Sequence, residues 1–139
     1  MPQPRLFLDT AYINALFNTR DQWHSKALEW EIKLEAEKRL LVTTQLVLVE
    51  IGNGLSRPPF RQNAASIIRN LQNNSAVEVV PVTPTTFARA FDLFEQRPDK
   101  SWGLTDCFSF ITMQDNQLTD ALTTDDHFRQ AGFNALLLD

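Results

Sequence analysis

Arg5-Leu6-Phe7-Leu8-Asp9-Thr10 is the stretch that decides the fold, because a short apolar run ends there at an acidic residue. Residues 5–8 have the length and the apolar content of a buried strand. Residues 10–18 carry apolar side chains at helical spacing, so we expect a helix to begin directly after Asp9. A strand that passes straight into a helix is the first half of a β-α-β unit, and such units build parallel sheets.

The same alternation of short strands and longer helices continues to the end of the chain. Further strands are expected at 40–43, 77–82, 121–124 and 135–138, and helices at 22–39, 45–55, 62–72, 84–96, 105–116 and 126–131. Thr44 and Thr83 are expected to cap the helices that follow them, with Pro84 at the first helical position. The order predicts an α/β fold with a central, mainly parallel sheet, helices on both faces and right-handed crossovers.

Length and charge limit the class of protein. The chain has 139 residues, the usual size of one compact domain, so we expect residues 1–139 to form a single domain. Hydrophobic residues make up 43% and charged residues 22%, which is enough for a core and excludes a disordered acidic tail. The formal net charge of −4 argues against a basic nucleic-acid arm. Bound divalent cations would reverse the local sign, so phosphates are not excluded as ligands.

Cysteine content and hydropathy bear on the compartment. Cys107 is the single cysteine, so no disulfide can form within the chain, as in proteins of a reducing cytosol. Residues 1–9 contain one positive charge and a short apolar run, which does not make a signal peptide. No apolar stretch approaches the roughly 18 residues that span a bilayer. We therefore predict a cytoplasmic protein with no membrane partner.

Four acids draw attention by their positions, and each also has an ordinary structural explanation. Asp9 ends the first strand, where it could cap the next helix. Glu50 is the one polar residue in an apolar part of its helix, so it needs an Arg partner, a metal or access to water. Asp106 lies in a first helical turn, which favours acids. Asp125 and Asp126 follow a strand, and one of them is expected to cap the next helix.

Taken together, the four acids are expected at one edge of the sheet, because ligands bind beyond the carboxyl ends of parallel strands. Two carboxylates about 4 Å apart repel each other by roughly 4 kcal/mol at an effective dielectric constant near 20. Four converging acids therefore need protons or cations. Oxygen ligands favour Mg²⁺ or Mn²⁺ over Zn²⁺, and such a cation can activate water and bind a phosphate. We expect a site for phosphodiester hydrolysis without a histidine or cysteine ligand nearby.

At this point the sequence resembles the PIN-domain family. Leu6-Phe7-Leu8-Asp9-Thr10 is similar to the opening of a PIN domain, and Glu50 stands where that family carries an acid on a helix. Leu104-Thr105-Asp106-Cys107 and Leu122-Thr123-Thr124-Asp125-Asp126-His127-Phe128 resemble the two closing motifs of the family. The resemblance covers nearly the whole chain, and the order and spacing of the four acids fit it.

The resemblance implies an α/β/α sandwich and a metal-dependent endoribonuclease that hydrolyses RNA with Mg²⁺ or Mn²⁺. Single-domain members of this size are most often VapC-type toxins of type II toxin–antitoxin pairs. A small antitoxin protein, an RNA substrate and a homodimer are the implied partners. The acids that carry over as catalytic and metal-binding residues are Asp9, Glu50, Asp106 and Asp125.

Three further residues near these motifs are weighed with them. The resemblance implies that Thr10 helps to position a metal-bound water. Asp99 lies in the loop before Asp106 and could act as an accessory acid. Asp126 departs from the family pattern, in which a basic or neutral residue is more usual beside the last acid. We predict that Asp125 binds metal because it ends a strand, whereas Asp126 begins a helix and favours its free backbone N–H groups.

Other hypotheses have clear sequence requirements. A phosphatase of the haloacid dehalogenase type needs a second Asp two residues after Asp9, where this chain has Ala11. A receiver domain needs an acid pair near the first strand and a late lysine, and the last lysine here is Lys100. Two alternatives keep the PIN fold: an RNA-processing nuclease outside a toxin system, and a catalytically inactive protein-binding module. The presence of all four acids favours the nuclease.

The two histidines and the cysteine suggest no separate chemistry. His24 is expected on the solvated side of its helix, and Cys107 is expected to be a small core residue. His127 follows Asp125 closely and is either structural or a substrate contact. Residues 51–77 contain three arginines and no acid, which fits either an RNA-backbone contact or a solvated helix face; they are Arg57, Arg61 and Arg69.

Aromatic residues are assigned to the core and to a dimer contact. Phe87, Phe91 and Phe94 have the spacing of a core-facing helical stripe, so they are not expected to be exposed for base stacking. Trp23 and Trp30 lie on one long helix whose apolar stripe exceeds what a small core covers, and we expect them to support a homodimer.

Overall fold

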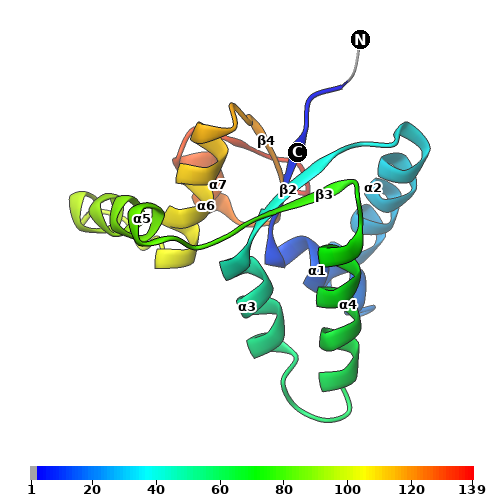
Figure 1. Cartoon of the computed structure of the whole chain (residues 1–139). Helices are drawn as coiled ribbons and strands as arrows, with labels where there is room; N and C mark the ends of the chain where they lie inside the picture. Colours follow the sequence, from blue (N-terminus) through cyan, green and yellow to red (C-terminus); the bar gives the residue numbers. More distant parts are fainter. Residues whose placement is uncertain (1–2) are drawn as a thin grey trace.

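The computed structural model describes residues 3–139 and contains a sheet of five parallel strands (Figure 1). The strands lie in the order β3-β2-β1-β4-β5, and each neighbouring pair is parallel. This confirms the predicted α/β class. The bounds of the strands are β1 (Leu6–Leu8), β2 (Leu41–Thr44), β3 (Val77–Val80), β4 (Asp120–Leu122) and β5 (Asn134–Ala135).

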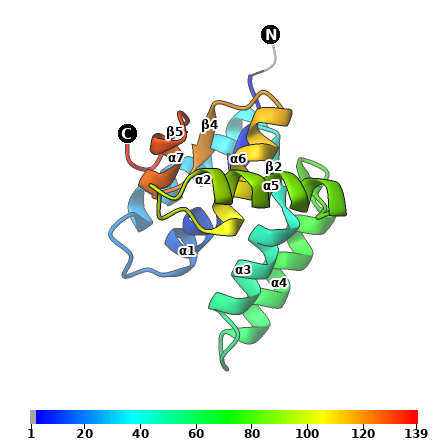
Figure 2. The ribbon, with the colours of Figure 1, turned by 90° about the vertical axis from the view of Figure 1, so that its left-hand side faces the viewer.

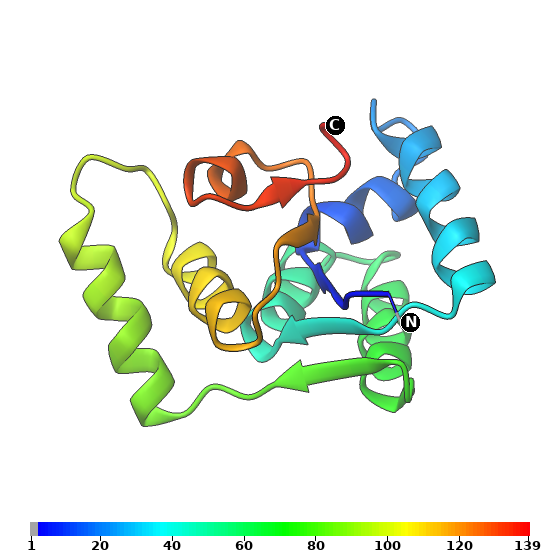
Figure 3. The ribbon, with the colours of Figure 1, turned by 90° about the horizontal axis from the view of Figure 1, so that it is seen from above.

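Helices cover both faces of the sheet, as predicted. They are α1 (Thr10–Phe17), α2 (His24–Glu37), α3 (Gln45–Gly54), α4 (Arg61–Asn73), α5 (Pro84–Gln96), α6 (Leu104–Asp115) and α7 (Asp126–Gln130). The chain moves outward from β1 to β3 and then returns to β4 and β5, so right-handed crossovers place α1–α4 on one face and α5–α7 on the other. The contacts agree: α1 packs on α2 and α3, and α6 packs on α5 and α7 (Figures 1 and 3). Across residues 3–139, every helix falls short of the length or apolar composition needed to cross a bilayer.

The strands are apolar because both faces of the sheet are covered. All three residues of β1 are buried, and Phe7 is fully shielded from solvent. Its ring lies 6.0 Å from that of Phe128, which in turn lies 5.0 Å from the ring of Phe110, edge to face. This aromatic cluster joins β1, α6 and α7, so it fixes the elements that carry three of the four candidate acids.

Capping residues set where two helices begin. The Thr44 side chain accepts a hydrogen bond from the Val47 backbone N–H at 3.1 Å and thereby starts α3 at the end of β2. Thr83 and Thr86 form a reciprocal capping box at α5, with Pro84 at the first helical position. Both predicted caps are confirmed. As a result α3, which carries Glu50, leaves the sheet at its carboxyl edge.

The last two strands are shorter than predicted. A strand was expected at 135–138, but β5 ends at Ala135, because residues 136–138 turn away. The turn still binds the sheet: the Leu137 backbone N–H donates to the Thr123 carbonyl at 3.2 Å, and Leu137 is fully buried. Likewise β4 ends at Leu122 and not at 124. Thr123, which follows the strand, is therefore free to direct its side chain toward Asp9.

The phenylalanine stripe on α5 was assigned to the core, and that prediction was wrong. Phe87, Phe91 and Phe94 are 44%, 42% and 46% exposed. Helix α5 lies at the margin of the molecule and packs mainly on α6, through the face that carries the fully buried Ala90 (Figure 3). Helical spacing alone cannot tell a stripe that meets the core from one that lies beside that contact.

The tryptophans of the long helix were expected to support a dimer contact, and the structure places both partly against the core of the same chain. Trp23 and Trp30 are half-buried and pack against the core of their own chain. The exposed apolar side chains of α2 are Leu28 and Ile32. The homodimer therefore needs another physical basis than these two rings.

Candidate metal centre

The four predicted acids meet at the point where the strand order reverses. β1 has β2 on one side and β4 on the other, and the chain runs outward from β1 through β2 to β3 on one side and from β4 to β5 on the other. Ligand sites of open parallel sheets lie beyond the carboxyl ends of the strands at such a point. Leu8 pairs in register with Leu122, and the Asp9 backbone N–H donates to the Leu122 carbonyl at 3.3 Å. Asp9 and the segment after β4 therefore leave the same edge of the sheet together.

One cleft at this edge contains all four carboxylates. Its lining comprises the four acids together with Thr10, Ala11, Asn14 and Asn53. Asp9 comes from the end of β1, Glu50 from α3, and the other two acids from the starts of α6 and α7. Among the described residues, the lining of this cleft includes no lysine or arginine.

Asp9 is the most buried of the acids, with 6% of its surface exposed. It stands at the N-cap position of α1, but its side chain makes no capping hydrogen bond. Instead, Asp9 Oδ2 accepts a hydrogen bond from the Thr123 hydroxyl at 2.7 Å. The same hydroxyl oxygen accepts the backbone N–H of Asp125 at 3.0 Å. Thr123 thus links the two acids at the strand ends, and the ordinary capping explanation for Asp9 does not hold.

Glu50 was expected on a largely buried helix, but it lies on the exposed side of α3. The helix buries Val47, Leu48 and Ile51 and turns Glu50 toward the cleft, so the apolar run reflects only one face of the helix. Glu50 Oε1 accepts a hydrogen bond from the Thr10 hydroxyl at 2.7 Å. The partner of this carboxylate is therefore a neutral hydroxyl and not an arginine.

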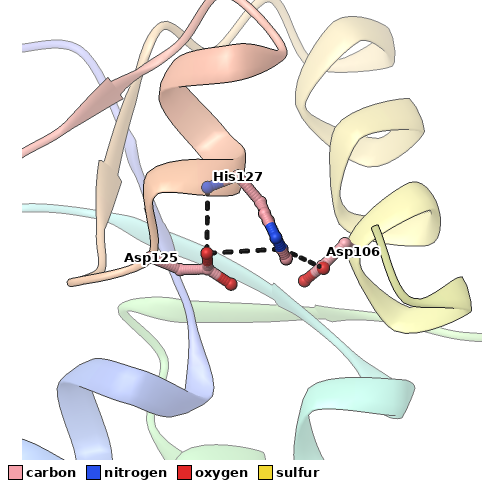
Figure 4. Close-up of side chains that lie close together, drawn as sticks. All are labelled: Asp106, Asp125 and His127. Atoms are coloured by element: carbon pink, nitrogen blue, oxygen red, sulfur yellow. Dashed lines mark hydrogen bonds and ion pairs between the residues drawn. The ribbon is translucent and has the colours of Figure 1, made fainter. Parts of the chain in front are cut away.

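His127 joins Asp106 and Asp125, which corrects the expectation of a site without histidine (Figure 4). His127 Nδ1 lies 3.0 Å from Asp106 Oδ2 and 3.4 Å from Asp125 Oδ1. Asp106 Oδ2 also accepts the backbone N–H of Gly103 at 3.0 Å, which fixes it in the first turn of α6. The sequence signal that could have revealed His127 is its position two residues after Asp125. In a helix that begins after Asp125, residue 127 lies in the first turn, next to the carboxylate that caps the helix.

Asp125 and Asp126 differ in what they contact. We predicted that Asp126 serves the helix start, but Asp125 is the residue that caps α7, accepting the His127 backbone N–H at 2.9 Å. Asp125 nevertheless lines the cleft. Asp126 is exposed and lies 4.0 Å from Arg129. One carboxylate has two oxygens, so capping α7 and facing the cleft are compatible in Asp125.

Three other side chains considered from the sequence lie outside the cleft, namely Asp99, Cys107 and His24. Asp99 forms two hydrogen bonds of 3.0 Å with Arg97 and has no contact with the acids. Cys107 is fully buried, as predicted. His24 is half-buried with Nδ1 2.7 Å from the Ala15 carbonyl, so its predicted solvation was wrong. Asn14 and Asn53 were missed, although they follow Thr10 and Glu50 by one helical turn, at i+4 and i+3.

The electrostatics of the cleft favour a bound cation. The pKa of Asp9 is raised from 3.8 to about 7, mainly by burial; the charges of Glu50 and Asp106 contribute to the rise, and the Thr123 hydrogen bond opposes it. The Glu50 carboxylate is partly desolvated within the cleft, which raises its pKa in spite of the Thr10 hydrogen bond. These groups resist ionisation together unless positive charge is supplied. Carboxylate, hydroxyl and amide oxygens are a donor set that fits a hard divalent cation.

Comparisons with known proteins agree with the fold. The family model of the PIN domain matches residues 6–134. The crystal structure of the Mycobacterium tuberculosis toxin VapC20, described as cleaving the sarcin–ricin loop, is 26% identical with a TM-score of 0.78, covering 92% of this chain and 95% of that chain. FitAcB from Neisseria gonorrhoeae is 16% identical with a TM-score of 0.62, covering 94% of each chain. No curated protein sequence matches the chain.

The chain belongs to the PIN-domain family, since the family model spans nearly its whole length. Its parallel five-stranded sheet between two helical layers is the PIN fold. Within that family it is similar to a VapC toxin over more than nine-tenths of both chains. This confirms the resemblance that the four short motifs indicated.

We predict that Asp9→Asn stabilises the metal-free protein at pH 8. The pKa of Asp9 is about 7 in the folded protein and 3.8 as the ordinary value, so the folded state holds the proton more tightly. The contribution of the Asp9 carboxyl to the free energy of unfolding is therefore complete below pH 3.8 and is lost as the pH rises through 7. Asparagine keeps the Thr123 contact without the charge, and a gain of about 1–4 kcal/mol is expected, since one pKa unit is about 1.4 kcal/mol.

Urea denaturation in EDTA at pH 4.5 and pH 8 measures this effect. The advantage of Asp9→Asn over the natural protein should grow with pH, and Mn²⁺ at pH 8 should reduce it by stabilising the natural protein alone. Equal stabilities at pH 8 would contradict the strong perturbation of Asp9.

Proposed function

We propose that this protein is a Mg²⁺- or Mn²⁺-dependent endoribonuclease and the toxin of a type II toxin–antitoxin pair. The observation that carries the proposal is the cleft with four carboxylates and no basic lining residue among the described ones. Such a cleft repels a phosphodiester unless divalent cations are bound. With a cation bound, it combines phosphate binding with water activation, which is the chemistry of phosphodiester hydrolysis.

Asp9, Glu50, Asp106 and Asp125 would hold the cation, which supplies Lewis acidity and a water of lowered pKa when bound. The neutral groups around them keep the carboxylates in place. Thr123 orients Asp9, and the Gly103 N–H orients Asp106. Thr10 donates to Glu50, and because its hydroxyl lines the cleft it is also placed to orient a water. The amides of the two asparagines offer both donors and acceptors to a substrate phosphate or ribose.

RNA is proposed as the substrate because the similar VapC20 is described as a toxin that cleaves the sarcin–ricin loop, an RNA element. The arginines of residues 51–77 offer a place for its backbone. Helices α3 and α4 form a hairpin that extends away from the sheet (Figure 2), and Arg57, Arg61 and Arg69 are all exposed on it. Asn53 of α3 lines the cleft only four residues before Arg57. Phosphate contacts there would orient the strand without reading its sequence.

A toxin that cleaves RNA inside its own cell needs an inhibitor, so a small antitoxin protein is the proposed partner and the cytoplasm the proposed location. The similarity to VapC20 supports this role over an RNA-processing nuclease, and the complete acidic set supports an enzyme over an inactive binding module. We propose that residues 1–139 act as one domain in this function. Expression of the chain alone should arrest growth, and co-expression with the protein encoded beside it should restore growth.

A homodimer is also proposed, on a different surface from the tryptophans. We define the Phe row as Phe87, Phe91 and Phe94 of α5, whose rings stack with centroids 6.5 and 6.4 Å apart. Their exposed rings form one apolar strip along α5, and such strips mark association sites. A strip of identical residues is complementary to itself when two copies of α5 pack antiparallel about a two-fold axis. A second copy of the chain is therefore the occupant that we propose.

We predict RNA cleavage that requires a divalent cation. Purified protein should cleave RNA with Mg²⁺ or Mn²⁺ and lose at least about 100-fold in rate in EDTA, because the charged cleft then repels the phosphate. The measurement is cleavage of a labelled structured RNA, with excess Mn²⁺ added back to restore activity. Robust cleavage in EDTA would contradict the mechanism.

We predict that Asp125→Asn abolishes cleavage and Asp126→Asn does not. Asp125 lines the cleft, whereas Asp126 is exposed and lies near Arg129. Asparagine can still accept the His127 N–H, so the cap of α7 should persist and the melting temperature should change by less than about 4 °C. The two variants form a matched pair at adjacent positions. If Asp126→Asn is the inactive variant, the metal ligand is Asp126, and its assignment to Asp125 is wrong by one residue.

We predict that Phe91→Glu converts the protein to a monomer. A charge at the centre of the Phe row would be buried between two copies without a partner, which is strongly unfavourable. Light scattering at micromolar concentration should give about 32 kDa for the natural protein, twice the chain mass of 15.9 kDa, and the chain mass for the variant. Ile32→Glu is the control, because Ile32 is 71% exposed on α2 and should leave the dimer intact. A natural protein of 15.9 kDa would contradict the dimer.

A further inference from the structure

His127 gives one corner of the cleft a nitrogen donor. Its Nδ1 and one oxygen each of Asp106 and Asp125 lie within 4.8 Å of one another, and all three residues are half-buried (Figure 4). In the lining of the cleft itself, the side-chain atoms able to bind a metal are oxygens. A mixed set of one imidazole and two carboxylates has a different metal preference from a set of carboxylates alone.

The spacing of these donors matches a tetrahedral transition-metal site. Zinc binds histidine nitrogen and carboxylate oxygen at about 2.0–2.2 Å, so two of its ligand atoms lie about 3.3–3.5 Å apart. The Nδ1 atom is 3.0 Å from Asp106 Oδ2 and 3.4 Å from Asp125 Oδ1. Both distances are within a few tenths of an ångström of the zinc values, and the two carboxylate oxygens lie within 4.8 Å of each other. A hard cation such as Mg²⁺ prefers an octahedron of oxygens and gains little from the imidazole.

The other ring nitrogen of His127 is placed to support metal binding. Nε2 lies 3.3 Å from the Ser101 hydroxyl oxygen, which can accept a hydrogen bond from the Nε2–H. In that tautomer Nδ1 carries the lone pair and can bind a cation together with the two carboxylates, whereas in the other tautomer the Nδ1–H donates to Asp106. Metal-bound histidines normally donate their outer N–H to a nearby acceptor in this way. Ser101 and the cap of α7, in which Asp125 accepts the His127 backbone N–H, hold the ring from two sides.

We infer that Asp106, Asp125 and His127 form a binding site for Zn²⁺ and similar borderline cations within the acidic cleft. Two of its ligands belong to the set that we assign to Mg²⁺ or Mn²⁺, so the two classes of cation exclude one another. Affinity rises along the first-row divalent metals toward copper and zinc, so low concentrations of Zn²⁺ displace Mn²⁺. Zn²⁺ then acts as an inhibitor; this consequence, unlike the binding itself, rests on the proposed nuclease function.

The test measures metal binding by the metal-free protein. Co²⁺ is titrated first, because its visible absorption reports a tetrahedral site, and Zn²⁺ is then titrated in competition with it. His127→Asn is the decisive variant, since its side-chain amide can still hydrogen-bond to Asp106, and an amide nitrogen does not bind zinc. We expect the variant to lose the Co²⁺ spectrum and at least about 10-fold in Zn²⁺ affinity, while its Mn²⁺ affinity changes by less than about 3-fold. His24→Asn, which removes the histidine outside the cleft, should bind like the natural protein.

Equal Zn²⁺ affinities for the natural protein and His127→Asn would overturn the inference, and so would a parallel loss of Zn²⁺ and Mn²⁺ binding. Inhibition is measured separately, as the fraction of each protein's own Mn²⁺-dependent rate that remains when Zn²⁺ is added. The natural protein should be inhibited at lower Zn²⁺ than the variant. Tight Zn²⁺ binding without any RNA cleavage would refute the proposed function and leave the zinc site standing.

Discussion

The repulsion among four carboxylates at one sheet edge is the constraint on which the rest of the structure depends. The adjacent parallel strands β1 and β4 bring Asp9 and Asp125 to that edge, and the aromatic cluster behind them fixes α6 and α7. The groups that hold the acids are hydroxyls, backbone N–H groups and one imidazole, with no lysine or arginine among the described residues that line the cleft. They position the charges without cancelling them. The free energy of the folded state is therefore coupled to protons and to cations in the cleft.

Much of the fold could be predicted because local signals agreed with each other. Apolar runs of strand length, threonine caps and the Thr83–Pro84 start of a helix each specify one element, and right-handed crossovers then leave few topologies. The convergence of the acids followed from the same rule, since the carboxyl ends of parallel strands share an edge. Strand ends were less predictable. Residues 136–138 continue the hydrogen bonding of the sheet from a turn, and apolar composition alone cannot separate that from a strand.

The remaining features could not be predicted, because they depend on which face of each helix packs against a neighbouring element and which face is open to solvent. Glu50 sits in an apolar run, yet α3 is covered on one side only, and the carboxylate lies on the open side. The Phe row repeats at core spacing, yet it lies beside the contact of α5 with α6. His127 enters the site through the cap geometry of α7, a feature set by backbone conformation at Asp125. In each case the periodicity is right, and the missing information is the direction of the neighbouring element.

The neutral surroundings of the acids also fit the proposed action of a protein of net charge −4 on a polyanion. An arginine in the cleft would pair with a carboxylate and stabilise the empty site, but it would also occupy the position of a cation. Hydroxyl and amide partners leave the negative potential intact, which suits the cleft to divalent cations from solution. A bound cation would reverse the local sign and attract phosphate. In the proposed nuclease, RNA would be repelled until the metal is in place, and the affinity for RNA would follow the occupancy of the metal site. The exposed arginines of the α3–α4 hairpin take no part in this change of local charge, because among the described residues the cleft lining includes none of them.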